Sequence, residues 1–188
     1  MRVFDFDNTL YNGESSVDFA IFMIKSNYKI IFWLPRIFWN LLLYKLCIIK
    51  KDKMENTINK FIKRFFSNKS EINKLVLEFW KVNEKKLYFD IINDIKEEDI
   101  IISACPDFIL NKIINKLGTS NFICSEVDID KKKVMYLNFG DNKVKKYKEI
   151  YGNKIIDSFY TDSYNDKAMM DISSKVFLVR KGKIKEIK

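Results

Sequence analysis

The sequence predicts an α/β protein in which a mostly parallel sheet is covered by helices and a helical bundle is inserted near its start. From residue 99 onward, short apolar runs alternate with helical patterns, which is typical of such a sheet. Residues 14–95 look helical throughout, and a length of 188 residues suits one domain with a sizeable insertion. We therefore expect a core formed by residues 1–13 and 96–188 and a helical cap formed by residues 14–95.

Four amphipathic helices are expected in the cap. Apolar residues recur at helical spacing within residues 17–24, 58–65 and 72–80. Asp52 or Lys53 precedes the third helix, and Ser70 is the predicted N-cap of the fourth. Helices of this kind pack together as a small bundle.

The second cap helix, expected within residues 30–49, is almost wholly apolar. Pro35 is suited to its first turn, and its polar residues are few: Arg36, Asn40 and Lys45. A transmembrane span is not expected, because two basic side chains would each cost a few kcal/mol near the bilayer centre. Two interpretations stay open. The helix is buried against its partners, or it lies in a membrane interface with three aromatic anchors, Trp33, Trp39 and Tyr44.

The core elements follow in chain order. Strands are expected at residues 3–4, 100–102, 122–124, 155–160 and 176–179. Helices are expected at residues 106–117, 143–151 and 166–172, and residues 127–129 and 134–137 form a hairpin. Ligands of parallel sheets bind at the carboxyl ends of the strands, where this pattern places Asp5, Ser103 and Asp162.

The composition excludes several kinds of catalytic and metal site. The chain has no histidine, which excludes His-based metal sites, Ser-His-Asp triads and His general bases. Its cysteines, Cys47, Cys105 and Cys124, form no CxxC pair and suit a reducing cytosol. No leader precedes the first predicted strand, so we expect a cytoplasmic protein.

The net charge of +9 favours an anionic partner. A general bias of the composition toward lysine explains the charge equally well, without any partner. A phosphorylated metabolite or anionic lipid suits this charge. Nucleic acid is not expected, because no nucleic-acid-binding signature accompanies the charge.

Two acidic segments at opposite ends of the chain carry the strongest signal. Asp5 and Asp7 follow the first predicted strand, and Asp162 and Asp166 follow the strand at residues 155–160. Carboxylates gathered at neighbouring strand ends repel one another unless a cation lies between them. The pattern therefore predicts a divalent-metal site suited to phosphate chemistry.

These segments resemble the four motifs of the haloacid dehalogenase-like hydrolases. Asp-x-Asp-x-Thr at residues 5–9 is similar to motif one, and Ser103 to motif two. Lys143 in Gly-x-x-Lys is similar to motif three, and Asp162 and Asp166 in Asp-Ser-x-x-Asp to motif four. The resemblance covers the whole chain. It implies a Rossmann-like core with an inserted α-helical bundle, similar to the type-1 cap of the phosphoserine-phosphatase-like branch.

The resemblance also implies roles for these residues. Asp5 is the expected nucleophile, forming an aspartyl-phosphate, and Asp7 the expected general acid and then base. Mg²⁺ is expected on the Asp5 carboxylate, the Asp7 carbonyl and Asp162. The expected phosphate ligands are Ser103, the Ala104 amide and Lys143.

Other residues have supporting roles by the same resemblance. Asp166 acts through a metal-bound water or holds Lys143, and Glu14 is similar to a substrate-contacting acid of phosphoserine phosphatases. Thr9 caps the turn, and Asn165 contacts phosphate or shapes its loop. Asn8 replaces a common glycine and tolerates left-handed backbone. Three further lysines compete with Lys143 for motif three: Lys145, Lys146 and Lys148.

A further resemblance, to C-type phosphatidylglycerophosphatases, concerns the substrate. It rests on the apolar, Pro-containing cap segment, the Gly-x-x-Lys run and the short tail after residue 178. The cap holds fifteen Lys and Arg against nine Asp and Glu, a balance of +6. These features imply a membrane lipid phosphate as substrate and peripheral contact with the inner membrane face. The alternatives are a small-metabolite phosphatase of the phosphoserine type and a non-catalytic basic binding module.

Overall fold

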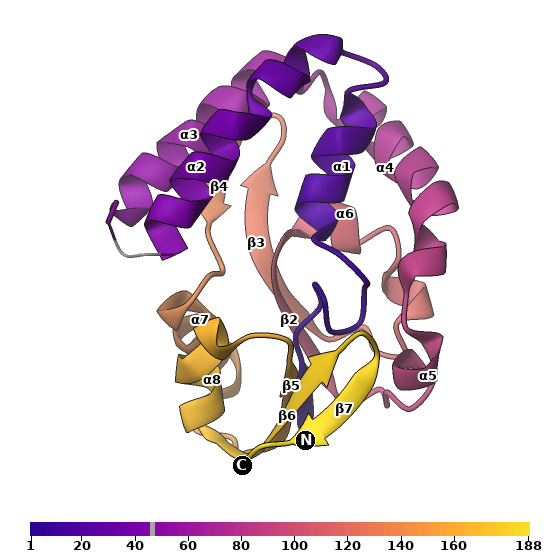
Figure 1. Cartoon of the computed structure of the whole chain (residues 1–188), viewed down its shortest axis with the longest axis vertical. Helices are drawn as coiled ribbons and strands as arrows, with labels where there is room; N and C mark the ends of the chain where they lie inside the picture. The colour runs from indigo at the N-terminus through magenta and orange to yellow at the C-terminus, as the bar shows by residue number, and fades with distance from the viewer. Residues whose placement is uncertain (46–47) are drawn as a thin grey trace.

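Across residues 1–45 and 48–188, which the computed structural model describes, the strands form one seven-stranded sheet in the order β4-β3-β2-β1-β5-β6-β7 (Figure 1). The strands are β1 (Arg2–Phe4), β2 (Ile100–Pro106), β3 (Phe122–Asp128), β4 (Lys133–Tyr136), β5 (Ile156–Thr161), β6 (Ser173–Arg180) and β7 (Lys183–Glu186). Five neighbouring strands are parallel to one another: β3, β2, β1, β5 and β6. The edge strands β4 and β7 pair antiparallel with β3 and β6. The predicted α/β class with a mostly parallel sheet is confirmed.

Side chains of the central strands alternate between two apolar layers. Val3 and Phe159 point to the face covered by α7 (Asp141–Tyr151) and α8 (Lys167–Asp171), where they pack with Tyr147 and Met169. Phe4 and Ile101 point to the opposite face and join a larger cluster that extends into the helices of the cap. Burial on both faces explains why these strands are continuous apolar runs.

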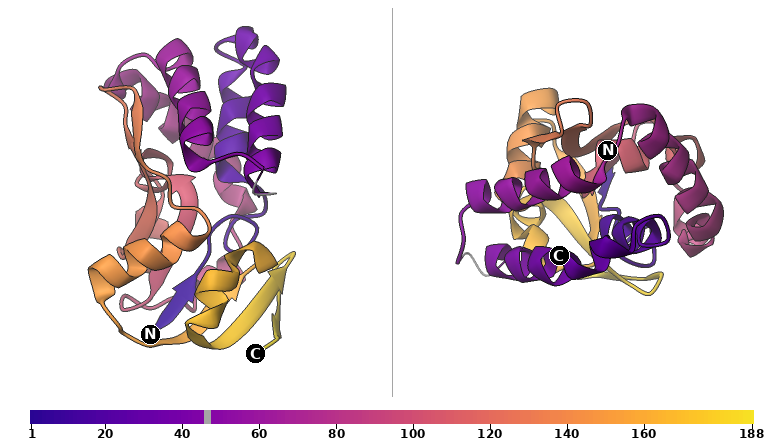
Figure 2. Two further views of the ribbon diagram at one scale, coloured as in Figure 1. Left: turned by 90° about the vertical axis from the view of Figure 1, so that its left-hand side faces the viewer. Right: turned by 90° about the horizontal axis from the view of Figure 1, so that it is seen from above.

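The remaining helices lie mainly at one end of the molecule, away from the two termini (Figures 1 and 2). They are α1 (Ser15–Met23), α2 (Leu34–Lys45), α3 (Lys51–Phe65), α4 (Lys69–Asn83), α5 (Phe89–Ile92) and α6 (Asp107–Leu110). Short 3-10 turns η1 (Tyr28–Phe32) and η2 (Glu84–Lys86) join α1 to α2 and α4 to α5. Two further turns, η3 (Ile114–Lys116) and η4 (Tyr164–Asp166), precede β3 and α8. We call α1 to α4 the cap helices. Their separation from the core at residues 13 and 96 stays a prediction.

The β3–β4 hairpin connects these two parts. It contacts α3, where the Val134 N–H donates to Asn59 Oδ1 at 2.7 Å. The two strand segments predicted at residues 122–124 and 127–129 are one continuous strand, β3, with an irregular register opposite Val127.

Two core predictions are wrong in detail. The strand expected to end at Ser103 continues to Pro106 through a shift in register. The helix expected over residues 106–117 is only α6 and, three residues later, η3. Gly118 ends this segment with a φ of 76° and lies close against Ile95, as a left-handed stop requires.

The cap predictions also need correction. The expected helix at residues 30–49 is divided at Trp33 into η1 and α2, and Cys47 lies outside the described residues. The N-cap of α4 is Asn68, whose Oδ1 accepts from the Glu71 N–H at 2.9 Å, and not Ser70. Helix α3 begins at Lys51, before the expected Asp52 or Lys53.

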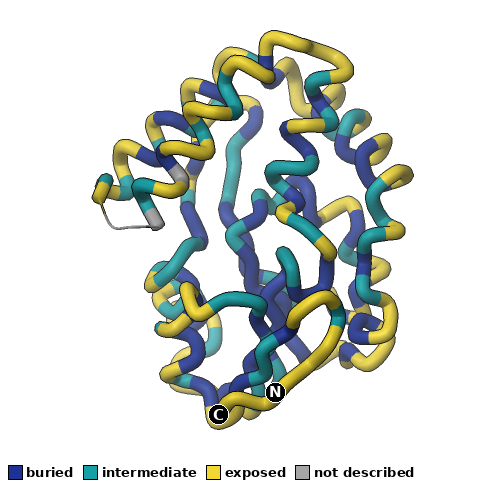
Figure 3. The backbone as a smooth tube through the Cα atoms, viewed as in Figure 1, coloured by how far each residue is buried: buried dark blue, intermediate teal, exposed yellow. Residues whose placement is uncertain are grey.

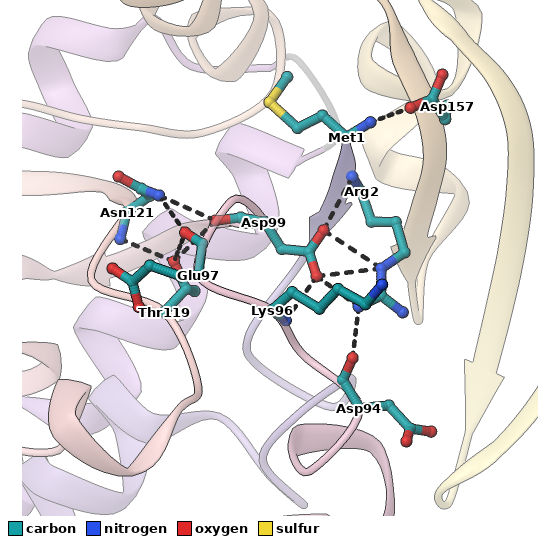
Figure 4. Close-up of polar contacts among 9 residues, drawn as sticks. All are labelled: Met1, Arg2, Asp94, Lys96, Glu97, Asp99, Thr119, Asn121 and Asp157. Atoms are coloured by element: carbon teal, nitrogen blue, oxygen red, sulfur yellow. Dashed lines mark hydrogen bonds and ion pairs between the residues drawn. The ribbon is translucent and has the colours of Figure 1, made fainter.

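The amino end of the sheet is tied together by Asp99, the residue before β2 (Figure 4). Its buried carboxylate accepts hydrogen bonds from the Arg2 N–H at 3.1 Å, the Arg2 guanidinium and the Lys96 N–H at 2.9 Å. The Asp99 carbonyl accepts from Thr119 Oγ1 at 2.8 Å. This cluster joins β1 to the start of β2 and the loop before β3.

Burial is uneven across the cap (Figure 3). The cap core includes Met54, Ile72 and Phe79, all almost fully buried, and Trp33 packs edge-on against Phe65. Trp39 of α2 is instead 62% exposed. The segment of η1 and α2 therefore has a packed side and an exposed apolar side, and its contact with a membrane interface stays a prediction. Within the described chain, no helix is both long enough and apolar enough to cross a membrane.

Candidate active site

The candidate site lies where β1, β2 and β5 end. Asp5 directly follows β1, and its N–H donates to the Tyr160 carbonyl of β5 at 2.8 Å. β1 lies between β2 and β5 in the sheet. The carboxyl ends of these three strands therefore bring the Asp5, Ser103 and Asp162 regions to one edge, as the sequence predicted.

The turn after β1 positions Asp7. Asn8 adopts a left-handed conformation with a φ of 58°, as expected at a position where glycine is common. The Ser15 N–H at the start of α1 donates to Asp7 Oδ1 at 2.7 Å. An amide without a partner inside the helix, at its N-terminus, favours a carboxylate, so α1 orients Asp7. The sequence analysis did not identify this role of Ser15.

Lys143 is the lysine that enters the site. Its Nζ lies 2.8 Å from Asp5 Oδ1 and 2.8 Å from Asp166 Oδ1, and its side chain is 4% exposed. Lys145 and Lys148 are exposed, and Lys146 pairs with Glu126 outside the site. Lys143 lies in the first turn of α7, which begins after Gly140 with a φ of 55°.

Asp166 is held by a residue that the sequence analysis missed. Thr161 Oγ1 donates to Asp166 Oδ2 at 2.9 Å, while Lys143 occupies Oδ1. Of the two expected roles for Asp166, holding Lys143 is the contact that the structure contains. Thr161 directly precedes Asp162 in the chain, and a hydroxyl residue at a strand end beside a buried acid is the signal that identifies it.

Ser103 and Ala104 lie in the irregular part of β2. Ser103 is fully buried, and its Oγ accepts from the Cys105 N–H at 2.9 Å, which leaves its hydroxyl hydrogen for another acceptor. Asn138 Nδ2 donates to the Ser103 carbonyl at 2.8 Å, and Ser125 Oγ donates to the Ala104 carbonyl at 2.7 Å. These bonds fix the backbone that would present the Ala104 amide.

The remaining predicted residues differ in their surroundings. Glu14 accepts a hydrogen bond from Asn8 Nδ2 at 3.1 Å and borders the same space as Asp7. Asn165 is exposed, and its N–H donates to Ser163 Oγ, a bond that shapes the loop. Thr9 is fully buried in the turn, and its N–H donates to the Phe6 carbonyl. Its hydroxyl has no hydrogen-bond partner among the described residues, so the side chain does not cap the turn as expected.

The site carries an excess of negative charge. Burial raises the pKa of Asp5 well above its ordinary value, and the Lys143 ammonium opposes this shift. Burial and then the charge of Glu14 raise the pKa of Asp7 to about 7. Burial, followed by the charges of Glu14 and Asp166, raises the pKa of Asp162. Burial alone would lower the pKa of Lys143, but Asp5 and Asp166 outweigh it and raise that pKa.

This donor set suits a hard divalent cation. Among the described residues, no group of three or more Asp, Glu or Cys side chains is arranged to hold a metal. The expected set needs only two carboxylates, from Asp5 and Asp162, with the Asp7 carbonyl and water. A bound cation would offset the burial and the negative charge of other nearby acids, Asp166 among them, that raise the pKa values of these two carboxyls. The residues present therefore fit Mg²⁺.

An apolar cavity of about 410 Å³ adjoins the site. Asp7, Glu14 and Ala104 line one part of it, and the rest is lined mainly by side chains of α1, α2, α3, α6 and the β3–β4 hairpin. The cavity therefore joins the acidic residues after β1 to the interior of the cap helices.

Residues 3–171 match the family described as haloacid dehalogenase-like hydrolase. No curated protein sequence matches the chain. A protein of unknown function from Bordetella pertussis Tohama I has a similar structure, with a TM-score of 0.74 and 15% identity; 94% of this chain and 87% of that chain are covered. A phosphoserine phosphohydrolase-like protein from Francisella tularensis is also similar, with a TM-score of 0.65, 17% identity and coverage of 94% and 86%. At these identities the two likenesses show the fold.

Proposed function

We propose that this chain, which belongs to the haloacid dehalogenase-like hydrolase family, is a Mg²⁺-dependent phosphatase that hydrolyses phosphate monoesters through an aspartyl-phosphate on Asp5. The observation that carries the proposal is the buried Lys143, bonded at 2.8 Å to both Asp5 and Asp166. The Lys143 ammonium, fixed between two acids from opposite ends of the chain, orients the Asp5 carboxyl and favours its ionised, nucleophilic form against the burial that raises its pKa.

The first half of the reaction transfers the phosphoryl group to the protein. An Asp5 carboxylate oxygen attacks phosphorus, and the bond from phosphorus to the ester oxygen breaks. Asp7 donates its proton to that oxygen, so the alcohol leaves neutral. A carboxyl pKa of about 7, caused by burial and by Glu14, suits a group that must hold a proton near neutral pH.

The second half releases phosphate. Asp7, now ionised, takes a proton from water as the water oxygen attacks phosphorus. The bond between Asp5 and phosphorus breaks, which restores the Asp5 carboxylate. Lys143, the Ser103 hydroxyl and the Ala104 amide donate to the phosphoryl oxygens. When bound by Asp5, Asp162 and the Asp7 carbonyl, Mg²⁺ supplies positive charge that offsets the charge of the phosphoryl group.

For the substrate we propose a membrane lipid phosphate such as phosphatidylglycerophosphate, handled at the inner face of the membrane. The exposed apolar side chains of η1 and α2 support this proposal: Phe32, Phe38, Trp39 and Leu42. Basic residues on the same part of the cap, Lys29 and Arg36 among them, are exposed as well. Apolar and basic groups together suit an anionic lipid surface.

The alternative substrate is a small soluble phosphomonoester of the phosphoserine type. It is supported by Glu14, which borders the site next to Asp7 and offers a carboxylate to a substrate ammonium. The similar Francisella tularensis structure is described as phosphoserine phosphohydrolase-like. Under this alternative the exposed side of α2 has no part in catalysis.

A phosphate-release panel tests these proposals. Phosphatidylglycerophosphate in mixed micelles, phosphoserine and a small aryl phosphate are compared with Mg²⁺ and with EDTA. We expect Mg²⁺-dependent release that Asp5→Asn abolishes and that Asp90→Asn, which changes an exposed carboxylate of α5, leaves intact. If Asp5→Asn binds anionic vesicles like the natural protein and neither releases phosphate, the chain is a binding module and the enzyme proposal fails.

A further inference from the structure

The proposed chemistry does not use the apolar cavity that lies beside Asp7. Its walls come from three cap helices and the β3–β4 hairpin, with prominent apolar side chains from Ala20, Ile37, Met54, Ile58, Phe61 and Val134. This cavity of about 410 Å³ is partly open to solvent, and its walls are mainly apolar. An apolar group that enters it removes apolar surface from water, which is favourable.

The polar lining of this cavity is confined mainly to the catalytic end. Among its described lining residues the polar ones are Asp7, Glu14, Ser16, Ser125 and Tyr44, and none is Lys or Arg. Asp7 and Glu14 belong to the site, Ser16 lies in the first turn of α1, and Ser125 Oγ bonds to the Ala104 carbonyl. A small ligand with a carboxylate would find no cation along these walls, whereas a hydrocarbon chain matches them.

The other end of the cavity reaches the surface of α2. Phe38 and Leu42 line the cavity and are also 45% and 48% exposed. Trp39, between them in the chain, is exposed too. Apolar side chains therefore run from the protein surface, through the cap, to the carboxylates after β1.

We propose that this cavity binds the hydrocarbon chain of the substrate, which makes the substrate class an amphiphilic phosphate monoester with an apolar chain close to the phosphate. The inference rests on the proposed phosphatase function and deepens it. It narrows the lipid substrate to one whose chain begins near the phosphate, because the charged phosphodiester of phosphatidylglycerophosphate would find no cation along the cavity walls. The phosphate lies at Asp5 and Lys143, and the chain extends between α1, α2 and α3 toward Phe38 and Leu42. The chain covers the apolar walls and leaves no buried charge unpaired.

The size of the cavity suits one chain. A water molecule takes up about 30 Å³ of liquid, and a methylene group is of similar size. A volume of about 410 Å³ is therefore large enough for one alkyl chain. We therefore expect the preference for chain length to rise and then level off as the cavity becomes full.

The test is a series of linear alkyl phosphates, from butyl to dodecyl, held below their micelle concentrations. For the natural protein with Mg²⁺, kcat/KM should increase about two- to fourfold per added methylene until the cavity is full. Phosphoserine serves as the polar reference and should be a poorer substrate than decyl phosphate. A flat series would overturn the proposal while leaving the phosphatase function in place.

Two variants of α1 separate the cavity from the surface of the cap. Ala20→Phe places a ring inside the cavity. Ile21→Phe places the same ring at the next residue of the chain, whose side chain is 49% exposed and does not line the cavity. Ala20→Phe should reduce the ratio of decyl to butyl turnover at least about tenfold, whereas Ile21→Phe should keep it. Equal ratios in both variants would mean that long chains adsorb elsewhere, and the proposal would be wrong.

Where turnover cannot be compared, calorimetry measures the binding of the compounds instead. If Ala20→Phe does not fold, or if no ester is hydrolysed, binding of decyl phosphate to the natural protein is compared with binding of butyl phosphate and of decyl alcohol. Tighter binding of decyl phosphate than of both reference compounds supports the cavity, even where the phosphatase proposal fails. Equal binding of the two phosphates contradicts it.

Discussion

The two ends of the sheet each bury an aspartate beside a basic residue, and they treat its charge differently. At the amino end, burial opposes ionisation of Asp99, but hydrogen bonds from Arg2 and Lys96 outweigh it and lower its pKa. At the carboxyl end, Asp5 and Asp166 share one ammonium, that of Lys143. Burial there raises the pKa of Asp5.

This difference separates a structural ion pair from a reactive one. The protein itself satisfies the carboxylate of Asp99, so the pair contributes to folding. Asp5 and the acids around it have too few hydrogen-bond donors and too little nearby positive charge to stabilise all of their ionised carboxylates. A cation and a phosphoryl group with its own hydrogen-bond needs fit that deficit.

The largest effect is expected from Lys143→Met. Two buried carboxylates, Asp5 and Asp166, lose their common partner, which should destabilise the protein by about 3–5 kcal/mol. Phosphate release should fall by about a hundredfold or more. Urea unfolding and turnover at saturating Mg²⁺ measure the two effects. Lys148→Met, an exposed lysine of the same helix, is the matched control and should change neither.

A smaller effect is expected at the other end of the sheet. Asp99→Asn weakens the charged hydrogen bonds with Arg2 and should cost about 1.5–3 kcal/mol of stability. Turnover per folded molecule should stay within about twofold of the natural protein, because no residue of the site contacts Asp99 among the described bonds. A large loss of turnover at temperatures where the variant is folded would break the comparison between the two ends.

The stabilisation by Asp99 should depend on pH in one direction. A carboxyl with a lowered folded-state pKa stabilises fully above its unfolded value, about 3.9. That contribution is lost as the pH falls from there through the folded-state pKa. The difference in unfolding free energy between the natural protein and Asp99→Asn should therefore vary by no more than about 0.3 kcal/mol from pH 5 to 7. Below about pH 4 the difference should shrink. A difference that grows on acidification would contradict the assignment.

The smallest effect on stability is expected on the exposed side of α2. Trp39→Ser removes an indole that is 62% exposed, so the unfolding free energy should change by no more than about 0.5 kcal/mol. Sedimentation with anionic vesicles should decrease if this side contacts lipid. Unchanged sedimentation would favour the soluble alternative for the substrate.

Sequence patterns predicted the elements whose signals are local. The strand before Asp5, the left-handed Asn8 and the start of α7 near Lys143 each follow from a short run of residues with a strong preference. The contacts of Lys143 were anticipated because its spacing from Gly140 resembles a known motif. Spacing alone does not separate it from Lys145 or Lys146. Burial does, and burial is set by the rest of the fold.

The misassigned elements depend on distant partners. β2 continues past Ser103 because β3 supplies pairing as far as Ser125, which no local pattern reveals. The helix expected after Pro106 is shortened to four residues, and the residues that follow it pack as turns against the core. The cavity has no sequence signature at all, because its lining residues are ordinary apolar side chains from separate helices.

The central position of β1 has a consequence for how the protein is made. Val3 pairs with Ile100 on one side and Phe159 on the other, so the strand that precedes the nucleophile depends on partners far along the chain. During synthesis, Asp5 emerges early but stays unplaced until β5 has left the ribosome. A nascent or truncated chain lacking β5 would expose β1 as an unpaired edge, which makes it a substrate for chaperones and an aggregation hazard.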